Sequence, residues 1–388
     1  MNVNIQEEVM DVWRNTAVEV AKEIAVHSRE VDELGVFPTA SINLLRTTGL
    51  MGIAVPAEYG GPGIPIHSIA NICKIISGAC LSTGMIFSMH LQQVMIIASF
   101  AHENLKKRLM PKIASGEVYV VSVTSDYREP KGRRSTASFL EETKKNYVLE
   151  RHAPTVTGAG YGDVFLISMK EKELNPQLSF VIAEREQISV DLNTASWKSL
   201  GMRGTQSCEI SLVGSVPKDQ VITSAMYDQV CNEVMNPVGH ILWASSWLGA
   251  VASEFRAFMR IIRSKTYRNN YNLDSDLFSH EIGKIRLKLD IVETYLHDFI
   301  SYYSANKEGN AIFSNTYKIK VNNLKIISSE MLNEVMDALV QLGGVKLGYL
   351  KNDVTSIERV YRDIRSSRIM LSNEKLKMIN GKLTILER

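Results

Sequence analysis

Cysteine is scarce in this chain, and its scarcity excludes several classes of protein. Only 4 of the 388 residues are cysteine, at positions 73, 80, 208 and 231. They form no CxxC pair and have no histidine at metal-ligand spacing, so we expect neither a zinc or other metal site nor a disulfide framework. We interpret the four as ordinary buried thiols.

The chain also lacks an excess of charge of either sign. It has 44 Lys and Arg against 42 Asp and Glu, a formal net charge of +2, and basic clusters such as "KKR" at 106–108 and "GRR" at 132–134 are short. An extended basic surface is therefore not predicted. Nucleic acid is not an expected partner.

Neither a signal peptide nor a membrane span is expected. The first residues, "MNVNIQEEVMDVWRN", carry acids at positions 7, 8 and 11 and no uninterrupted apolar stretch. The uncharged run at 237–253 is short for a membrane span, and its small and aromatic residues are typical of a buried helix. These features predict a cytoplasmic protein.

Changes of hydrophobic periodicity divide the chain into three parts. Hydrophobic residues make up 45% of it, enough to bury a large core. Apolar residues recur every three or four positions up to about residue 115, alternate between about 117 and 222, and then return to the helical period. The last part contains four long helical segments, at about 226–267, 276–306, 312–342 and 351–380. We therefore predict an α+β multidomain fold with a helical domain (1–116), a compact β-domain (117–224) and an antiparallel four-helix bundle (225–388).

Five stretches, taken in order, resemble one known family. They are "GLMGIAVPAEYGGPG" (49–63), "HENLKKRLMPKIASGE" (102–117), "LGMRGTQSCEISL" (200–212), "ALVQLGG" (338–344) and "ERVYRDIR" (358–365). Together they are similar to the acyl-CoA dehydrogenase superfamily over nearly the whole chain. The resemblance implies an N-terminal α-helical domain, a central β-barrel and a C-terminal four-helix bundle, with FAD where barrel and bundle meet, usually in a homotetramer. In that family a carboxylate removes an α-proton and the flavin accepts the β-hydride.

The resemblance also implies which residues hold the flavin ring. In "VSVTSDYREPKG", Thr124 keeps the family's ring-facing hydroxyl and Ser125 adds a second donor, whereas residues 126–129 replace a glycine-rich turn that binds pyrophosphate. In "HAPTVTGAGYGD", Thr157 stands where the family has a threonine at flavin N5, and Thr155 stands where it has tryptophan. Without the indole one face of the flavin is more open, a feature of relatives that use oxygen. From the residues alone, these side chains are equally ordinary strand hydroxyls.

The adenine end of FAD is bound in the family by a neighbouring subunit. "SKTYRNNY" places Tyr267 at the stacking position and Ser264 at a position usually held by arginine, for which Arg268 is a nearby substitute. Gly343 and Gly344 keep a close backbone approach. Because apolar bundle helices are seldom left exposed to water, we expect a homo-oligomer, a dimer or a tetramer.

The family's catalytic base is missing. Aligning "RDIR" with the family's arginine and aspartate puts Leu371 at the position of the glutamate, and leucine cannot accept a proton. The candidates for a substitute are Glu374, three residues on, and His240, beside the place where some relatives carry their base. A further candidate catalytic residue is His90, because flavin-dependent monooxygenases of the superfamily have a histidine in the same first-domain helix. The plainer interpretations are a helix-start acid for Glu374, a satisfied core residue for His240, and for His90 a histidine that dehydrogenase relatives also have.

Three functions stay open on this basis. The first is an acyl-CoA dehydrogenase-like flavoprotein oxidoreductase that uses FAD, with FMN as the alternative, oxidises an acyl thioester of coenzyme A or an acyl-carrier protein, and passes electrons to a separate acceptor. The second is a monooxygenase that uses O2 and reduced flavin from a flavin reductase. The third is a catalytically degenerate member with a binding or assembly role. We prefer the first because the resemblance is to the family at large.

Overall fold

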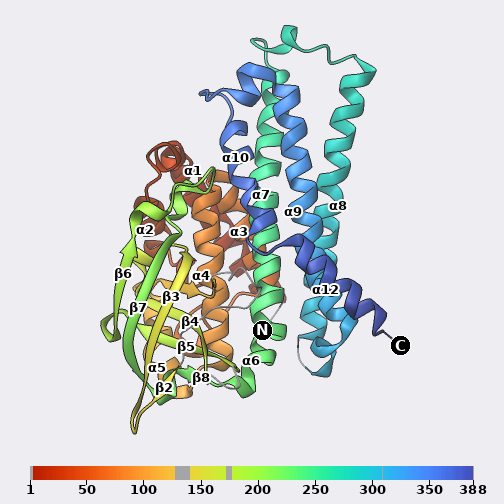
Figure 1. Cartoon of the computed structure of the whole chain (residues 1–388). Coiled ribbons are helices and arrows are strands. Elements are labelled where there is room, and N and C mark those ends of the chain that lie inside the picture. Colours follow the sequence, from red (N-terminus) through yellow and green to blue (C-terminus); the bar gives the residue numbers. More distant parts are fainter. Residues whose placement is uncertain (1–2, 127–139, 172–176, 308, 388) are drawn as a thin grey trace.

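The computed structural model describes residues 3–126, 140–171, 177–307 and 309–387. Figure 1 shows the strands on the left, two N-terminal helices, α3 (Ile66–Ala79) and α4 (Leu81–Phe100), in the middle, and a bundle of long helices on the right; the other N-terminal helices lie on the side of the strands. The order of helices, then strands, then helices follows the periodicity of the sequence. The predicted domain order is therefore the order of the elements in the fold.

The N-terminal part contains five α-helices in the described residues. Helices α3 and α4 pack against α7 of the bundle, and α4 also packs against the first strand, β1. Their bounds are α1 (Val3–Leu34), α2 (Thr39–Thr47), α3 (Ile66–Ala79), α4 (Leu81–Phe100) and α5 (Glu103–Ala114). Helix α4 therefore contacts both the sheet domain and the bundle.

Helix α4 is apolar on nearly every side because other elements enclose it. Within the described part of the chain it is the one helix, Leu81–Phe100, long and apolar enough to cross a membrane, and 83% of the window tested is buried inside the protein. Such burial is that of a core helix in a globular protein. The uncharged run at 237–253 likewise forms part of a buried helix, as predicted.

The strands form two four-stranded sheets, in the orders β1-β4-β5-β8 and β2-β3-β7-β6. Only the β1-β4 pairing is parallel among the described pairs. The predicted central β-domain is confirmed, with two sheets in place of one continuous barrel ladder. The strand bounds are β1 (Val120–Val123), β2 (Glu141–Glu142), β3 (Asn146–Val156), β4 (Val164–Lys170), β5 (Leu178–Glu184), β6 (Ile188–Asn193), β7 (Cys208–Pro217) and β8 (Val221–Ile222).

The C-terminal part is a bundle of three long helices completed by shorter ones. The bounds are α6 (Ser224–Val230), α7 (Asn236–Ile262), α8 (Asp276–Asn306), α9 (Asn315–Gly344), α10 (Ile357–Ile364), α11 (Ser366–Ile369) and α12 (Asn373–Ile385). The fourth predicted helix, 351–380, is therefore wrong as a single element. Residues 351–356 are not helical, and the rest is divided into α10, α11 and α12. The Ser372 backbone is not helical, and its side-chain hydroxyl accepts a hydrogen bond from the Lys375 backbone nitrogen at the start of α12.

The three parts are joined at α10. The guanidinium of Arg362 donates to both carboxylate oxygens of Asp32 in α1, at 2.9 and 2.6 Å, and to Glu358 at 2.6 Å. The neighbouring carboxylate of Asp363 accepts the backbone N–H of Met202, in the loop before β7. Two consecutive residues of the bundle thus hold the N-terminal helices and the sheet domain in place.

All four cysteines lie in the described residues and none is in a disulfide; three of them are buried and Cys231 is half-buried. The prediction of buried thiols is therefore confirmed for the first three. Within the described ranges, no group of three or more His, Cys, Asp or Glu side chains is placed to hold a metal ion.

Candidate functional site

The ends of β1 and β3 bring the predicted ring-binding hydroxyls together. Ser125, just after β1, donates its hydroxyl to the Thr155 carbonyl at 2.7 Å and accepts the Thr155 backbone N–H at 3.3 Å. Thr124 and Thr155 are exposed, and Thr157 is half-buried at the end of β3. The ends of β1 and β3, which belong to different sheets, are thus in direct contact through Ser125 and Thr155, and Thr124 and Thr157 lie close to them in the chain. We refer to these four residues as the sheet edge.

A buried arginine that the sequence analysis did not single out fixes this edge. Arg151 in β3 has a side chain only 1% exposed and pairs with Asp126 at 2.6 Å. It also donates to the Ser125 carbonyl at 2.7 Å. The signal was present in the sequence, because Arg151 lies on the buried face of an alternating strand. Of the replaced pyrophosphate turn, residues 127–129 lie outside the described residues.

Thr157 is the first member of a chain of hydroxyls. Its Oγ1 lies 2.9 Å from Ser207 Oγ, which lies 2.8 Å from Thr205 Oγ1, and Thr205 donates to the Met202 carbonyl at 2.8 Å. Ser207 and Thr205 are buried. Both belong to the stretch "LGMRGTQSCEISL" that carried the resemblance, but nothing in the spacing marked them as partners of Thr157.

On the bundle side, a buried cation contacts the backbone of Leu371, the residue at the position of the missing base. Leu371 is half-buried in the turn between α11 and α12. Its carbonyl accepts a hydrogen bond from the ammonium of Lys325 in α9, which also donates to the Asn373 side chain. Lys325 is fully buried, and burial lowers its pKa to about 8.

The nearest carboxylate reaches Lys325 only through Asn373. The amide nitrogen of Asn373 donates to Glu330 at 3.2 Å, and Glu330 pairs with Lys377 at 2.7 Å. Ion pairing and hydrogen bonding lower the pKa of Glu330 against the opposing effect of burial. This turn therefore combines a half-buried apolar side chain with a buried positive charge on its backbone.

His90 and His240 both have backbone partners in the core. His90 is fully buried; its Nδ1 accepts the Val120 N–H at 3.0 Å and its Nε2 donates to the Met51 carbonyl at 2.9 Å. His240 is 2% exposed and donates from Nδ1 to the Val321 carbonyl at 2.9 Å. Burial lowers the pKa of each imidazole to about 4. These contacts favour the plainer interpretation, two neutral structural histidines, over a catalytic role.

Glu374 lies in the first turn of α12 with its side chain 84% exposed, 3.2 Å from Lys377. The sequence pattern also allowed a helix-start acid at this position, and the geometry fits that interpretation. None of the three candidate catalytic residues is therefore placed against Leu371 by a contact within the described residues.

The residues predicted for the adenine end lie at one end of the bundle, where α7 and α9 finish (Figure 1). Tyr267 is half-buried and Arg268 exposed in the segment after α7. At the end of α9, a Cβ on Gly343 would lie 2.8 Å from the Gly348 backbone nitrogen, and Gly344 has φ +58°. Both glycines are thus required by the local backbone whether or not a ligand binds there.

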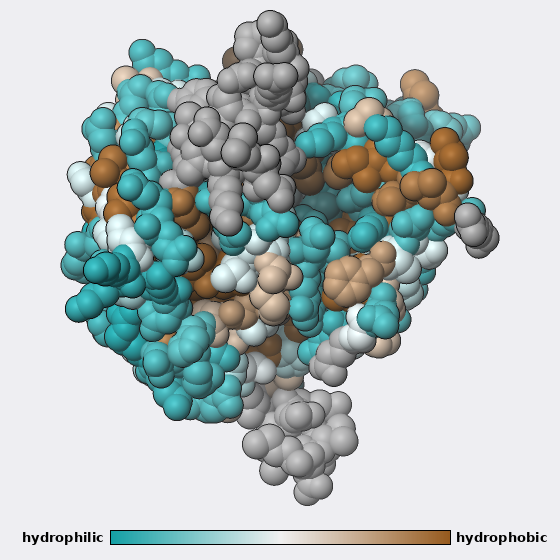
Figure 2. Space-filling model, turned by 60° about the horizontal axis from the view of Figure 1, so that its bottom comes forward, coloured by the Kyte–Doolittle hydropathy of each residue, from teal (hydrophilic) through white to brown (hydrophobic). Residues whose placement is uncertain are grey.

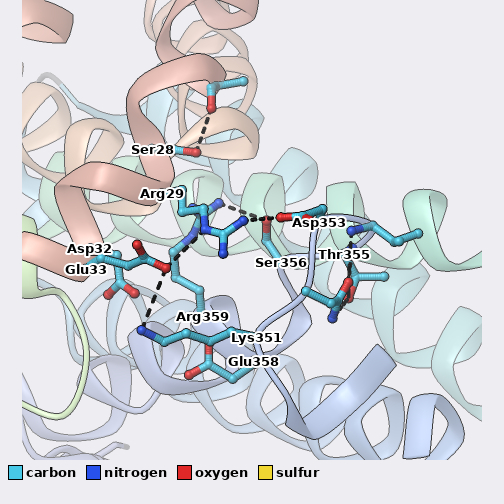
Figure 3. Close-up of a pocket in the computed structure, with 13 residues that line it drawn as sticks. Ser28, Arg29, Asp32, Glu33, Lys351, Asp353, Thr355, Ser356, Glu358 and Arg359 are labelled. Atoms are coloured by element: carbon cyan, nitrogen blue, oxygen red, sulfur yellow. Dashed lines mark hydrogen bonds and ion pairs between the residues drawn. The ribbon is translucent and has the colours of Figure 1, made fainter. Parts of the chain in front are cut away.

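A polar pocket of about 230 Å³ lies between α1 and the segment 351–359 (Figure 3). Its charged groups pair with one another: Arg29 binds Asp353 and lies 3.0 Å from Glu33, and Lys351 lies 3.9 Å from Glu33. Because cations and carboxylates neutralise each other across it, we interpret the pocket as a joint between α1 and the bundle.

Comparison with proteins of known sequence agrees with this architecture. The chain is 25% identical to a probable acyl-CoA dehydrogenase of Bacillus subtilis over 90% of its own length and 60% of that protein's. It is 24% identical to the short-chain specific acyl-CoA dehydrogenase of Clostridium acetobutylicum, with 97% of both covered. The chain spans 53% to 60% of the length of the first curated relatives it matches.

Solved structures share the fold. The dibenzothiophene monooxygenase of Paenibacillus sp. A11-2 superimposes with a TM-score of 0.84 at 18% identity, with 97% of each chain covered. Butyryl-CoA dehydrogenase of Megasphaera elsdenii superimposes with a TM-score of 0.82 at 15% identity, covering 100% of this chain and 99% of the other.

Two sequence models of one family match the two helical parts. The N-terminal domain of acyl-CoA dehydrogenase matches residues 6–117, and the C-terminal domain of acyl-CoA dehydrogenase matches residues 237–375. Together they cover well over half of the chain and flank the sheet domain on both sides. The chain therefore belongs to the acyl-CoA dehydrogenase superfamily, a family of FAD-dependent flavoproteins.

Proposed function

We propose that this protein is a flavin-dependent oxidoreductase that acts on an acyl thioester of coenzyme A or a carrier protein. The observation that carries the proposal is the match of both helical domains to the family on either side of a sheet domain whose edge keeps Thr157. The proposed domain limits are those expected from the sequence, 1–116, 117–224 and 225–388.

The proposal of a flavin at the sheet edge is supported by the kind of groups found there. Thr124, Ser125, Thr155 and Thr157 offer hydroxyl and backbone groups, and the Arg151–Asp126 pair anchors the segment that carries Ser125. We propose FAD, with FMN as the alternative, bound there. Tyr267, Arg268, Gly343 and Gly344 would serve the adenine end, in a neighbouring copy of the chain. A bound flavin supplies the two-electron acceptor for the reaction.

Two roles are then proposed for residues of this chain. The hydroxyls of the sheet edge orient the flavin ring, and the apolar side chain of Leu371 helps to exclude water from the reacting carbon. Because leucine cannot take a proton, the α-proton of a thioester needs another acceptor. His240 and Glu374 remain the proposed acceptors, and His90 remains the proposed catalytic residue of a monooxygenase, although the contacts of all three side chains favour structural roles. A positioned base is typically worth ~100- to 10,000-fold in rate.

A second function, flavin-dependent monooxygenation, is favoured by two specific observations. Leu371 removes the base that dehydrogenation needs, and the exposed Thr155 replaces the tryptophan that covers one flavin face in the family. The solved structures with this fold include a dibenzothiophene monooxygenase. Such an enzyme would receive reduced flavin from a reductase and would need no carboxylate at position 371.

The proposed partners follow from these two functions. A dehydrogenase passes electrons to an acceptor such as an electron-transferring flavoprotein, and a chain of that description is among the structures with this fold. Figure 2 shows a mostly hydrophilic face with separate hydrophobic patches. Exposed apolar side chains in the C-terminal helices include Ile369, Met378 and Ile385. We propose a homo-oligomer, a dimer or tetramer, in the cytoplasm.

The test is the spectrum of the purified protein followed by two reactions. A stoichiometric flavin absorbance supports the proposal, and a protein that binds neither FAD nor FMN when they are added contradicts it. With flavin bound, anaerobic bleaching by a panel of acyl-CoA thioesters supports dehydrogenation. Consumption of O2 by the reduced protein with a transient flavin–oxygen absorbance, and no bleaching by any thioester, supports monooxygenation.

A further inference from the structure

The hydroxyl chain from Thr157 into the sheet domain has only one proton per member. Thr157, Ser207 and Thr205 each carry a single O–H, so each donates one hydrogen bond and accepts others. The last partner, the Met202 carbonyl, has no proton and only accepts. The same carbonyl also accepts the indole N–H of Trp197 at 3.1 Å. The chain therefore ends at a pure acceptor.

That end sets the direction of every bond. Thr205 donates its one hydroxyl proton to the Met202 carbonyl. Ser207 must therefore be the donor in the 2.8 Å contact between Ser207 and Thr205. Ser207 then has no proton left, so Thr157 must be the donor in its 2.9 Å contact with Ser207. The Thr157 oxygen is left with lone pairs and no free proton.

We infer that Thr157, whose proton is donated to Ser207, can only accept a hydrogen bond from a bound flavin, and that the site therefore binds reduced flavin more tightly than oxidised flavin. This inference rests on the proposed flavin function, with N5 of the ring at Thr157. The N5 atom of oxidised flavin is an acceptor, which Thr157 cannot satisfy, whereas N5 of reduced flavin carries an N–H that Thr157 accepts. Ser207 and Thr205 are positioning residues that enforce this choice.

The size of the preference follows from the cost of reversing the chain. Reversal would let Thr157 donate, but Thr205 would give up its bond to Met202. Because Trp197 keeps that carbonyl satisfied, the loss is one neutral hydrogen bond. We expect about a tenfold bias, equal to about 30 mV in a two-electron potential.

The experiment compares the Kd of oxidised FAD with that of dithionite-reduced FAD, measured anaerobically by quenching of tryptophan fluorescence. In Ser207→Ala the hydroxyl of Thr157 is free to donate to N5 of oxidised FAD. The Kd of oxidised FAD divided by the Kd of reduced FAD should therefore fall about tenfold. Thr205→Val should act in the same direction, because Ser207 loses its acceptor, and it serves if Ser207→Ala does not fold. Ser211→Ala, on the same strand but bonded to His152 at 2.7 Å, is the matched control and should leave the ratio unchanged.

The outcomes separate this inference from the proposed function. An unchanged ratio in folded Ser207→Ala and Thr205→Val overturns the inference while flavin binding still supports the function. Thr157→Val should weaken reduced FAD more than oxidised FAD, and equal weakening of both contradicts an acceptor-only hydroxyl. If neither redox state of FAD or FMN binds the wild-type chain, the proposed function fails and the inference fails with it.

Discussion

The sheet edge and the α11–α12 turn, which we propose as the two walls of the flavin site, differ in the chemistry of their side chains. The sheet edge is a row of neutral hydroxyls that ends at Thr157. The bundle wall is the apolar Leu371, with the buried ammonium of Lys325 on its carbonyl. The first offers hydroxyls that match those expected to hold a flavin ring, and the second has an apolar side chain where a carboxylate is expected, with a buried cation on its backbone. In this chain the groups proposed for cofactor binding are therefore kept, whereas the group expected for proton transfer is not.

The electrostatic consequence is specific to the bundle wall. A buried cation stabilises nearby negative charge and lowers the pKa of any carboxylate introduced beside it. Lys325 has no carboxylate within ion-pairing distance among the described residues, and Glu330 reaches it only through Asn373. Restoring the family's base at position 371 therefore requires attention to Lys325 as well.

The largest effect is expected at the ion pair that joins α10 of the bundle to α1. Arg362→Ala leaves Asp32 buried without its partner, and breaking a buried ion pair costs about 3–5 kcal/mol of unfolding free energy. Urea unfolding should show this loss as a lower midpoint. Arg286→Ala removes an exposed pair with Asp290 on α8 and should cost at most about 0.5 kcal/mol. Equal losses in the two variants would refute a special role for the α10 joint.

The next effect tests the missing base. Leu371→Glu should raise the rate of anaerobic bleaching by acyl-CoA about 100-fold, the lower range for a positioned base. The double variant Leu371→Glu/Lys325→Met should exceed it near neutral pH, because the carboxylate regains its ordinary pKa and is a stronger base. Leu371→Gln is the control of equal shape. No bleaching in either glutamate variant, with flavin bound, would show that the substrate does not reach this wall.

The bundle wall should also titrate in alkaline solution. Lys325 has a folded pKa of about 8, below its ordinary value of 10.5, so the folded state binds fewer protons between these values and stability rises with pH through that window. We expect the unfolding free energy of the wild type to gain about 1–2 kcal/mol over Lys325→Met between pH 7 and 9.5. Lys284→Met, at an exposed position on α8, should track the wild type. If the difference in unfolding free energy between the wild type and Lys325→Met does not change with pH, Lys325 is exposed to solvent in the folded state.

On the sheet side the corresponding titration is acidic. His90 holds the Val120 N–H of β1, and its folded pKa of about 4 lies below the ordinary 6.5. The unfolded state binds more protons between these values, so stability falls as pH drops through this window. The wild type should lose about 2 kcal/mol more than His90→Gln between pH 7.5 and 5, measured by thermal unfolding. His280→Gln, exposed on α8, should behave as the wild type.

The smallest effect is expected at Glu374. Its side chain is 84% exposed and pairs only with a flexible lysine, so Glu374→Gln should change stability by no more than about 0.5 kcal/mol and flavin-dependent rates by less than twofold. A large loss of rate with unchanged flavin binding would instead make Glu374 the substitute base.

Much of the fold could be read from periodicity, and its exceptions have local causes. The alternation that ends near residue 222 matches β8, which ends at Ile222, and the helix predicted at 276–306 is α8 at Asp276–Asn306. The single helix predicted at 351–380 is wrong because residues 351–356 are not helical and the Ser372 hydroxyl caps the start of a separate helix, an interaction that depends on one serine and not on hydrophobic spacing.

Of the site, the sequence by itself determined which side chains could take part: hydroxyls at the ends of two strands, and a leucine in place of a carboxylate. Only the tertiary structure decided what they do. Thr157 meets Ser207 across 50 positions of the chain, and Leu371 meets Lys325 across 46. Hydrogen-bond direction and buried charge arise from such long-range contacts, because a side chain's free proton and its pKa depend on the neighbours that packing supplies.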